Sequence, residues 1–233
     1  MTAPLFRDDP YLTTAEARVI AADDATVTLD RSLFYAAGGG QPGDTGRLEL
    51  EDGTFVDVSD ARYADDRTRI LLAVSAPVPT GAAVVQHLDW PRRYRLMRMH
   101  TALHLLSVAL PFPVTGGQIG ESESRLDFDI PDPNLDRDGI TAKVMALVGE
   151  DHPVSQEWIT DEELDASPEL VKTMAVKPPR GSGRVRLVRI GAVDLQPCGG
   201  THVASTKEIG TVAVTKIEKK GRQNRRVRLA LVE

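Results

Sequence analysis

The sequence predicts an α+β protein, in which a small N-terminal β-barrel-like domain precedes an α+β domain with an antiparallel sheet. Two patterns lead to this fold class. Short alternating runs between aspartate- and glycine-rich turns fill the first part, whereas the second part mixes helical periodicity with strand-like runs. Helices grouped with such strands are typical of α+β domains. We therefore expect a β-rich domain over residues 1–85 and an α+β domain over residues 86–233.

In the first part, short strands follow one another closely, which favours a small barrel or a curled sheet. The expected strands are 17–22, 26–30, 46–50, 55–59 and 69–74. The stretch 34–46 is too rich in glycine and proline for a regular element. A second such stretch, 77–81, is expected to connect the two domains.

The second part begins with apolar residues at helical spacing over 92–110, and Pro111 ends this helix abruptly. Two further helices are expected over 138–148 and 161–174. The expected strands are 124–130, 184–190, 210–217 and 226–232.

The composition favours a soluble globular protein, with 41% hydrophobic and 27% charged residues. No apolar run approaches the roughly 20 residues of a membrane-spanning helix, and the first residues lack the pattern of a secretory signal. The single cysteine excludes an internal disulfide. We therefore expect a cytoplasmic protein whose thiolate serves as a metal ligand or a nucleophile.

The net charge of −6 argues against a protein that coats nucleic acid along its whole surface. The charge is unevenly spread, because acidic residues outnumber basic ones over 1–66 and basic residues outnumber acidic ones over 207–233. A basic end could steer a polyanion onto one face, although solvated strands with basic outer faces explain the same pattern.

Two short motifs carry the candidate chemistry. His100 and His104 lie four residues apart in the predicted helix, so both imidazoles share one face. The spacing is that of HExxH, but Thr101 stands where that motif has the glutamate that acts as general base, which argues against a metalloprotease. The second motif joins Cys198 to His202 through two glycines, which would let the backbone turn until both side chains converge.

Three imidazoles and one thiolate form a borderline-soft donor set that suits Zn²⁺ better than Mg²⁺ or Ca²⁺. The predicted metal ligands are His100, His104, Cys198 and His202. If three of them bind the ion, the open position can hold water, whereas four would saturate the ion. Both arrangements fit the sequence. The remaining histidines, His87 and His152, fall outside the motifs.

These motifs also carry a family resemblance. HTALHLL followed by CGGTH resembles the editing domain of alanyl-tRNA synthetases and the free-standing alanyl-tRNA editing proteins of the AlaX type. Threonyl-tRNA synthetases share the two metal motifs in their editing domain. The loop FYAAGGGQPGDTG is similar to FYxxxGGQxGDxG of the alanyl branch and therefore favours that branch. The resemblance covers nearly the whole chain and corresponds to the medium-length, stand-alone class.

The resemblance implies a zinc-dependent deacylase whose substrate is mischarged tRNA, chiefly Ser-tRNA(Ala), with Gly-tRNA(Ala) as a further candidate. Three alternatives stay open. They are a non-catalytic, zinc-stabilised RNA-binding module, a threonyl-type editing domain acting on Ser-tRNA(Thr), and a hydrolase of small esters or amides.

The resemblance also implies roles for residues outside the metal motifs. Thr115 and Gln118 are expected to recognise the substrate, although a simple turn after the helix explains Thr115 equally well. The glycine-rich loop either forms tight turns or folds over the editing pocket, and its candidate residues are Gly39, Gly40, Gln41 and Asp44. The residues expected to contact tRNA phosphates are Arg92, Arg93, Arg95, Arg98, Lys219, Lys220 and Arg222.

Overall fold

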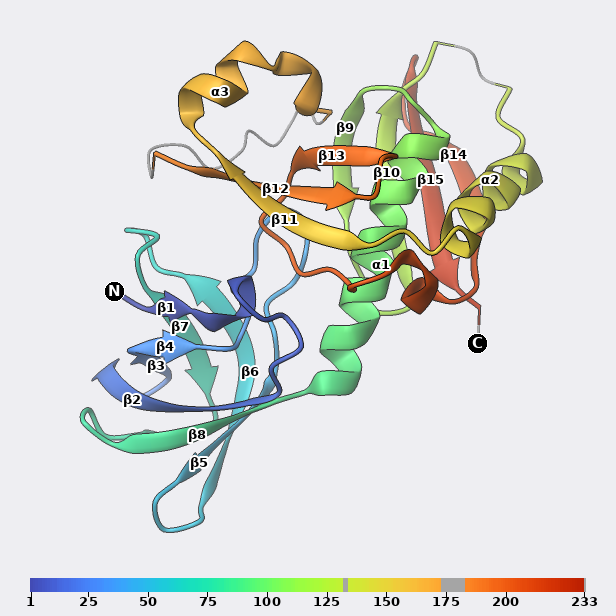
Figure 1. Cartoon of the computed structure of the whole chain (residues 1–233). Coiled ribbons are helices and arrows are strands. Elements are labelled where there is room, and N and C mark those ends of the chain that lie inside the picture. The colour runs from blue at the N-terminus through green and yellow to red at the C-terminus, as the bar shows by residue number, and fades with distance from the viewer. Residues whose placement is uncertain (132–133, 173–182, 233) are drawn as a thin grey trace. The chain divides into compact units, whose positions relative to one another are not determined.

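Six antiparallel strands close into a barrel in the N-terminal part of the chain, as the computed structural model shows (Figure 1). The structure describes residues 1–131, 134–172 and 183–232. The chain divides into two compact units, Met1–Tyr94 and Arg95–Glu233. A barrel followed by a region of helices and antiparallel sheets confirms the α+β class predicted from the sequence.

The barrel strands are hydrogen-bonded in the order β2-β3-β7-β6-β5-β8, and closure of the barrel leaves no unpaired strand edge. Their bounds are β2 Thr14–Ala22, β3 Thr26–Leu29, β5 Gly46–Leu50, β6 Phe55–Tyr63, β7 Ile70–Val74 and β8 Ala83–Leu88. The shorter elements of this unit are β1 Ala3–Pro4, the 3-10 turn η1 Leu5–Arg7 and β4 Arg31–Ser32.

Side-chain alternation fills the barrel interior. In β6, Val56 and Val58 are buried, and a bulge between Val58 and Asp60 shifts the alternation so that Ala61 becomes the next buried residue. The prediction for the stretch 77–81 was wrong, because it connects β7 to β8 within the barrel rather than one domain to another. Proline and glycine mark turns as well as linkers, and the composition alone does not separate the two.

A buried ion pair holds the glycine-rich stretch in the first unit. The guanidinium of Arg93 is fully buried and contacts both carboxylate oxygens of Asp44, which is 1% exposed. Arg93 also donates to the carbonyl oxygens of Pro10 and Leu33, at 2.9 Å and 2.8 Å. Asp44 in turn accepts a hydrogen bond from the backbone N–H of Tyr35. Every charged atom of the pair therefore has a partner inside the unit.

Among its described residues, the second unit contains two antiparallel sheets, most of helix α1, and the helices α2 and α3. One sheet has the strand order β14-β15-β10-β9, and the other has the order β11-β12-β13. The strands are β9 Val114–Gln118, β10 Glu123–Asp129, β11 Val154–Ile159, β12 Val185–Ile190, β13 Asp194–Pro197, β14 Val212–Lys219 and β15 Asn224–Leu231. The helices are α1 Trp90–Ala109, α2 Arg137–Gly149, α3 Asp161–Ala166, η2 Pro168–Leu170 and η3 Thr206–Ile209.

Helix α1 is buried on nearly every side from Leu96 to Leu106, as expected of a helix within a core. The helix predicted over 161–174 is shorter than expected, because α3 ends at Ala166 and Pro168 cannot continue it. Residues 173–174 of that prediction lie outside the described residues. No helix among the described residues is long and apolar enough to cross a membrane.

We expect Asp44→Ala to lower the free energy of unfolding by about 3–5 kcal/mol, because it leaves the buried Arg93 charge uncompensated. Urea unfolding followed by the fluorescence of Trp90, in a Trp158→Phe background, measures the effect. The control is Arg69→Ala, which breaks an exposed pair with Asp66 and should shift the midpoint far less. Equal shifts in the two variants would contradict a structural role for the buried pair.

Candidate metal centre

The four predicted metal ligands lie together in the second unit. His100 and His104 are one turn apart on α1, whereas Cys198 and His202 lie in the loop between β13 and η3. Each residue offers one ligand atom, and these four atoms lie within 4.8 Å of one another. The two sequence motifs therefore form one cluster.

The imidazole Nε2 atoms point towards the thiol. Nε2 of His100 lies 3.4 Å from Sγ of Cys198, and Nε2 of His202 lies 3.3 Å from the same sulfur. The three histidines are buried, with exposed fractions of 4–6%. This convergence of buried donor atoms is the arrangement that a metal ion requires.

Arg186 of β12 holds the loop that carries the cysteine. Its NH1 atom donates to the carbonyl oxygens of Cys198 and Gly200, both at 2.9 Å. The sequence argument for the paired glycines is not supported in detail, since neither Gly199 nor Gly200 adopts a positive φ. The arginine side chain, rather than left-handed backbone, fixes the turn.

Asp194 is a buried residue of β13 that the sequence argument missed. Its Oδ2 atom accepts hydrogen bonds from Nδ1 of His104 at 2.9 Å and from Nε2 of Gln196 at 2.8 Å. Its Oδ1 atom contacts Nζ of Lys172 at 2.5 Å. Because a carboxylate only accepts, Nδ1 of His104 carries the proton and Nε2 faces the cluster. The available signal was an acidic residue four positions before the cysteine.

Electrostatics favour a thiolate in the cluster. Burial by itself would raise the pKa of Cys198, but the neighbouring His100 and His202 outweigh it and hold that pKa well below its usual value. Burial and repulsion from His100 lower the pKa of His202 to about 3, so this imidazole is neutral. A thiolate and a neutral imidazole are the forms that bind metal ions.

In the pair formed by His104 and Asp194, the environment favours the charged form of both side chains, in contrast to the neutral His202. Burial would lower the pKa of His104, but its hydrogen bonds to Asp194 and Cys198 raise this pKa to about 9. Burial would raise the pKa of Asp194, but the hydrogen bond and the charge of His104 outweigh it and hold this pKa at about 2. A metal ion that binds His104 must therefore displace a proton, which makes binding pH-dependent.

The donor chemistry fits a transition metal ion. Three imidazole nitrogens and one thiolate sulfur are the soft and borderline ligands that such ions prefer, whereas Mg²⁺ and Ca²⁺ prefer oxygen. The histidine held by a buried carboxylate matches the outer support that metal-binding histidines usually have. The cluster can therefore bind a metal ion.

Comparison with known proteins assigns the family. Residues 185–228 match the profile described as the threonyl and alanyl tRNA synthetase second additional domain. The chain is 35% identical over 243 residues to the alanyl-tRNA editing protein AlaX-M of Methanosarcina barkeri, with 100% of both chains covered. The chain belongs to the AlaX-M family. The AlaX-M protein of Saccharolobus solfataricus is 32% identical over 234 residues, covering 97% of this chain and 98% of that protein.

The chain also resembles part of a longer enzyme. An alanine–tRNA ligase of Pyrobaculum arsenaticum is 34% identical over 233 residues, which are 94% of this chain but 25% of the ligase. These comparisons confirm the resemblance to alanyl-tRNA editing proteins that the two metal motifs and the glycine-rich loop predicted.

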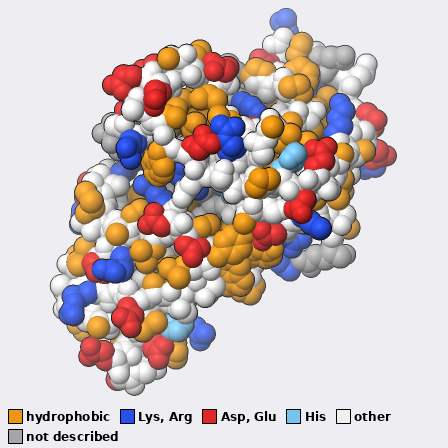
Figure 2. Space-filling model, in the orientation of Figure 1, with side chains coloured by type: hydrophobic (Ala, Val, Ile, Leu, Met, Phe, Trp, Pro, Cys, Tyr) orange, Lys and Arg blue, Asp and Glu red, His pale blue; other side chains and the backbone are white. Residues whose placement is uncertain are grey.

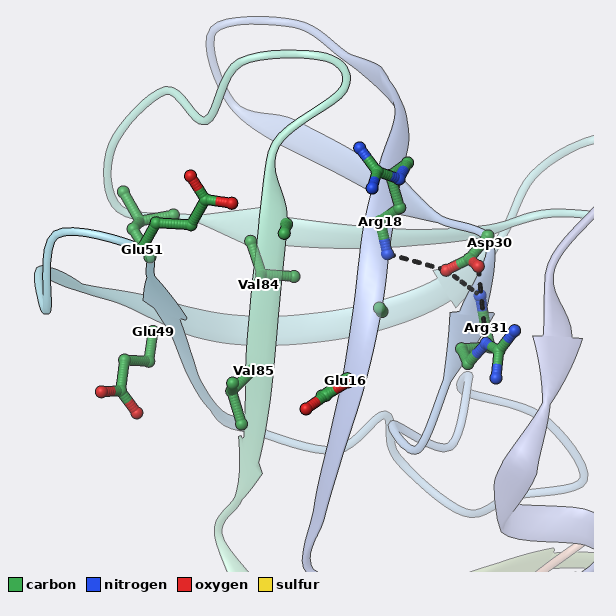
Figure 3. A pocket seen from close by; sticks show the side chains of 11 residues that line it. Glu16, Arg18, Asp30, Arg31, Glu49, Glu51, Val84 and Val85 are labelled. Atoms are coloured by element: carbon green, nitrogen blue, oxygen red, sulfur yellow. Dashed lines mark hydrogen bonds and ion pairs between the residues drawn. The ribbon is translucent and has the colours of Figure 1, made fainter.

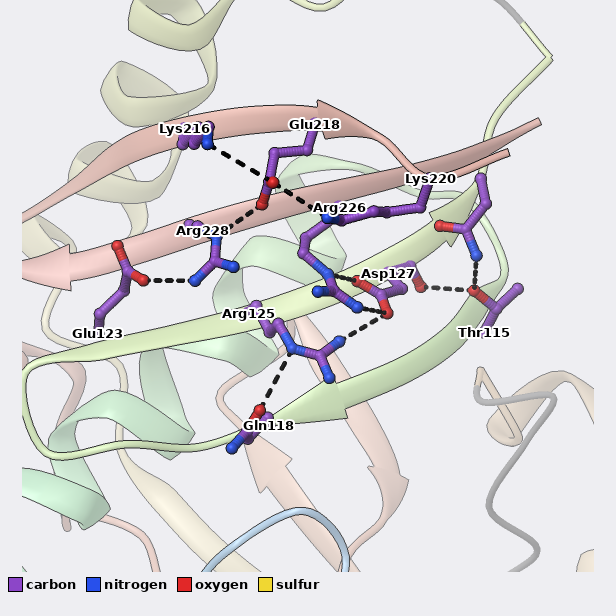
Figure 4. A network of polar contacts seen from close by, with 11 residues as sticks. Thr115, Gln118, Glu123, Arg125, Asp127, Lys216, Glu218, Lys220, Arg226 and Arg228 are labelled. Carbon is purple, nitrogen blue, oxygen red and sulfur yellow. Dashed lines mark hydrogen bonds and ion pairs between the residues drawn. The ribbon is translucent and has the colours of Figure 1, made fainter. Parts of the chain in front are cut away.

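In this AlaX-M chain, Thr115 and Gln118 share strand β9 (Figure 4). The hydroxyl of Thr115 donates to the carbonyl oxygen of Asp127 at 3.2 Å and accepts from Nδ2 of Asn224 at 3.3 Å. Gln118 is exposed, and its Oε1 atom accepts from Nε of Arg125 at 3.4 Å. These hydrogen bonds of Thr115 and Gln118 are made within the β9–β10–β15 part of the sheet.

The glycine-rich loop forms tight turns within the first unit. Gly39 and Gly40 have φ values of 58° and 83°, which favour glycine. Gly38 and Gln41 exchange two backbone hydrogen bonds of 3.0 Å, and Gln41 is 2% exposed. Asp44 pairs with Arg93.

The predicted tRNA-contacting residues differ in exposure. Lys219, Lys220 and Arg222 are exposed at the turn between β14 and β15. Arg92, Arg95 and Arg98 are half-buried, and Arg92 and Arg98 each donate to a backbone carbonyl oxygen. Arg93 is fully buried and bonded inside the first unit, a position that offers nothing to a phosphate.

On the face shown in Figure 2, positive and negative side chains of the described residues are interspersed. A depression on the outside of the barrel (Figure 3) is lined mainly by charged side chains of both signs. Its carboxylates are Glu16, Asp30, Glu49 and Glu51. They outnumber Arg18 and Arg31, so the depression repels phosphate groups.

We expect the purified protein to bind one equivalent of a divalent transition metal ion. Cys198→Ala should weaken binding by more than the roughly 10–100-fold typical for loss of an outer partner, because it removes a ligand. Competition with a chromophoric chelator measures the affinity. His87→Ala is the control, since His87 bonds Glu49 outside the cluster and its loss should leave metal binding unchanged. Equal affinities in the two variants would rule the cysteine out as a ligand.

Proposed function

We propose that this protein is a trans-editing hydrolase that removes a wrongly attached amino acid from tRNA. Its chief substrate is Ser-tRNA(Ala), and Gly-tRNA(Ala) is the second. The observation that carries the proposal is the joining, in one buried cluster, of the two motifs that the sequence shares with alanyl-tRNA editing domains. Relatives that match over their full length are named alanyl-tRNA editing proteins, which supports the same substrate class.

The chemical need for such an enzyme follows from the small difference between alanine and serine. A pocket that binds alanine cannot strongly reject a side chain that only adds a hydroxyl, and discrimination stays near a hundredfold. A second site that hydrolyses the wrong product supplies the missing accuracy. The proposed reaction is attack by water on the aminoacyl ester, which leaves free amino acid and intact tRNA.

We propose Zn²⁺ as the ion of the cluster, held by His100, His104, Cys198 and His202. When bound, zinc supplies a Lewis acid that polarises a neighbouring carbonyl group. The chain itself orients His104 through Asp194 and buries the three histidines, whereas Cys198 is half-buried. Asp194 also fixes which ring nitrogen of His104 carries the proton.

Thr115 and Gln118 are proposed to recognise the substrate, because a hydroxyl and an amide can pair with the serine hydroxyl and the ammonium group. Unpaired polar groups in a recognition site penalise the wrong substrate, which makes such residues a source of specificity. We propose that Gly39, Gly40 and Gln41 of the glycine-rich loop also take part in substrate binding.

A second candidate function is a non-catalytic, zinc-stabilised RNA-binding module. One observation favours it: four donor atoms within 4.8 Å of one another can saturate a tetrahedral ion. That alternative requires bound zinc without turnover.

We expect rapid release of labelled serine from Ser-tRNA(Ala), while Ala-tRNA(Ala) and Thr-tRNA(Thr) remain charged. Cys198→Ala should slow release by about 100-fold or more, the size typical for loss of a group that stabilises developing charge. Quenched-flow or filter-based deacylation measures the rates.

Ser-tRNA(Thr) and a serine methyl ester are the discriminating substrates. Faster turnover of Ser-tRNA(Thr) would replace the alanyl assignment by the threonyl one, and equal turnover of the small ester would indicate a general esterase. A zinc-loaded, folded protein that releases no serine would leave the RNA-binding module as the better explanation.

We propose that the turn between β14 and β15 contacts tRNA phosphates through Lys219, Lys220 and Arg222. Replacing all three by alanine should reduce the slope of log affinity against log salt concentration by about three units, one for each lost phosphate contact. Filter binding at several salt concentrations measures the slope. The matched control replaces Arg137, Lys143 and Lys207, which are exposed elsewhere in the second unit. Identical slopes in the two triple variants would exclude this surface.

A further inference from the structure

Thr101 lies on α1 directly after the first ligand histidine and is fully buried. Its hydroxyl oxygen makes three contacts. It lies 2.9 Å from the carbonyl oxygen of Met97, 3.1 Å from Nδ1 of His202 and 3.3 Å from the backbone nitrogen of Val203. Two of these three contacts therefore reach the loop that carries the other pair of ligands.

The proton positions in this group follow from what each partner can do. A hydroxyl has one hydrogen to donate and two lone pairs to accept with. The Met97 carbonyl oxygen only accepts, so it takes the hydroxyl hydrogen, whereas the Val203 N–H only donates. The remaining lone pair of Thr101 faces Nδ1 of His202, which must then carry a hydrogen. In a neutral imidazole, this leaves Nε2 unprotonated.

We infer that Thr101 is a positioning residue that holds His202 in the Nδ1-protonated form and so presents its Nε2 lone pair to the metal ion. The geometry agrees, since Nε2 of His202 is the ring nitrogen that lies 3.3 Å from the cysteine sulfur. The inference rests on the proposed zinc site but is independent of the proposed substrate.

A simpler explanation covers only part of the contacts. Threonine in the middle of a helix commonly donates to the carbonyl oxygen four residues earlier, and Met97 is that residue. Such a bond does not account for His202 and Val203, which belong to a different segment. Because the helix contact uses the single hydrogen, it leaves Thr101 as an acceptor towards the loop.

The position that Thr101 occupies has a different role in the HExxH motif. In HExxH the glutamate after the first histidine acts as a general base. Here a neutral hydroxyl occupies that position and serves the third histidine instead. His104 has a charged partner in Asp194, whereas His202 has an uncharged one. Outer partners of both kinds orient a ligand and fix its tautomer.

The test compares Thr101→Val, which keeps the shape but loses the hydroxyl, with Thr101→Ser, which keeps the hydroxyl. We expect zinc affinity, measured by competition with a chromophoric chelator, to fall about tenfold in Thr101→Val. Thr101→Ser should bind within about twofold of the unmodified protein, because the acceptor oxygen is retained. Equal affinity of the valine variant and the unmodified protein would overturn the inference.

A second measurement needs no variant. Long-range ¹H–¹⁵N correlation spectra of the zinc-loaded, ¹⁵N-histidine-labelled protein identify the protonated nitrogen of each ring. We expect His202 to carry its proton on Nδ1, and a proton on Nε2 would overturn the inference. Failure of the unmodified protein to bind zinc would overturn both the inference and the zinc site. If zinc affinity changes as expected in the two Thr101 variants but the protein deacylates no tRNA, only the proposed function is overturned.

Discussion

The second unit depends on bringing four donor side chains from two distant segments into one buried place. Buried polar groups are costly unless each of them has a partner. Residues of the surrounding elements supply such partners. Arg186 fixes the carbonyl groups of the cysteine loop, and Asp194 accepts from His104. Lys172 and Gln196 in turn bind Asp194, so the β12–β13 hairpin serves as the support of the cluster.

Ion pairs within the sheet β14-β15-β10-β9 show how a chain of net negative charge carries a basic C-terminal segment. Asp127 of β10 binds Arg226 through both carboxylate oxygens and also binds Arg125 (Figure 4). Glu218 likewise binds Arg228. These ion pairs across the strands neutralise the arginines within the sheet. Further basic residues, Lys219, Lys220 and Arg222, lie at the turn beyond these pairs, where Lys220 also pairs with Glu218 at 3.1 Å.

The sequence allowed prediction of the ligands and the fold class because both rest on local patterns. Histidine spacing within a helix and strand alternation are visible in a short window. β13 was missed because Asp194 and Gln196 are polar, and their burial depends on contacts with α1 that no local pattern reports. Similarly, a run of arginines before the metal motif gave no reason to separate Arg93 from its neighbours. Its burial depends on Asp44, far earlier in the chain.

The pairing of Arg93 with Asp44 also determines where the chain can be truncated. Asp44 belongs to the barrel, but its counter-ion is contributed by the first turns of the helix that later carries His100 and His104. A fragment ended at residue 85, the domain limit expected from the sequence, would lack both the end of β8 and this arginine. We therefore expect the barrel to fold in isolation, or as part of a fusion protein, only if the beginning of the helix that carries His100 and His104 is included.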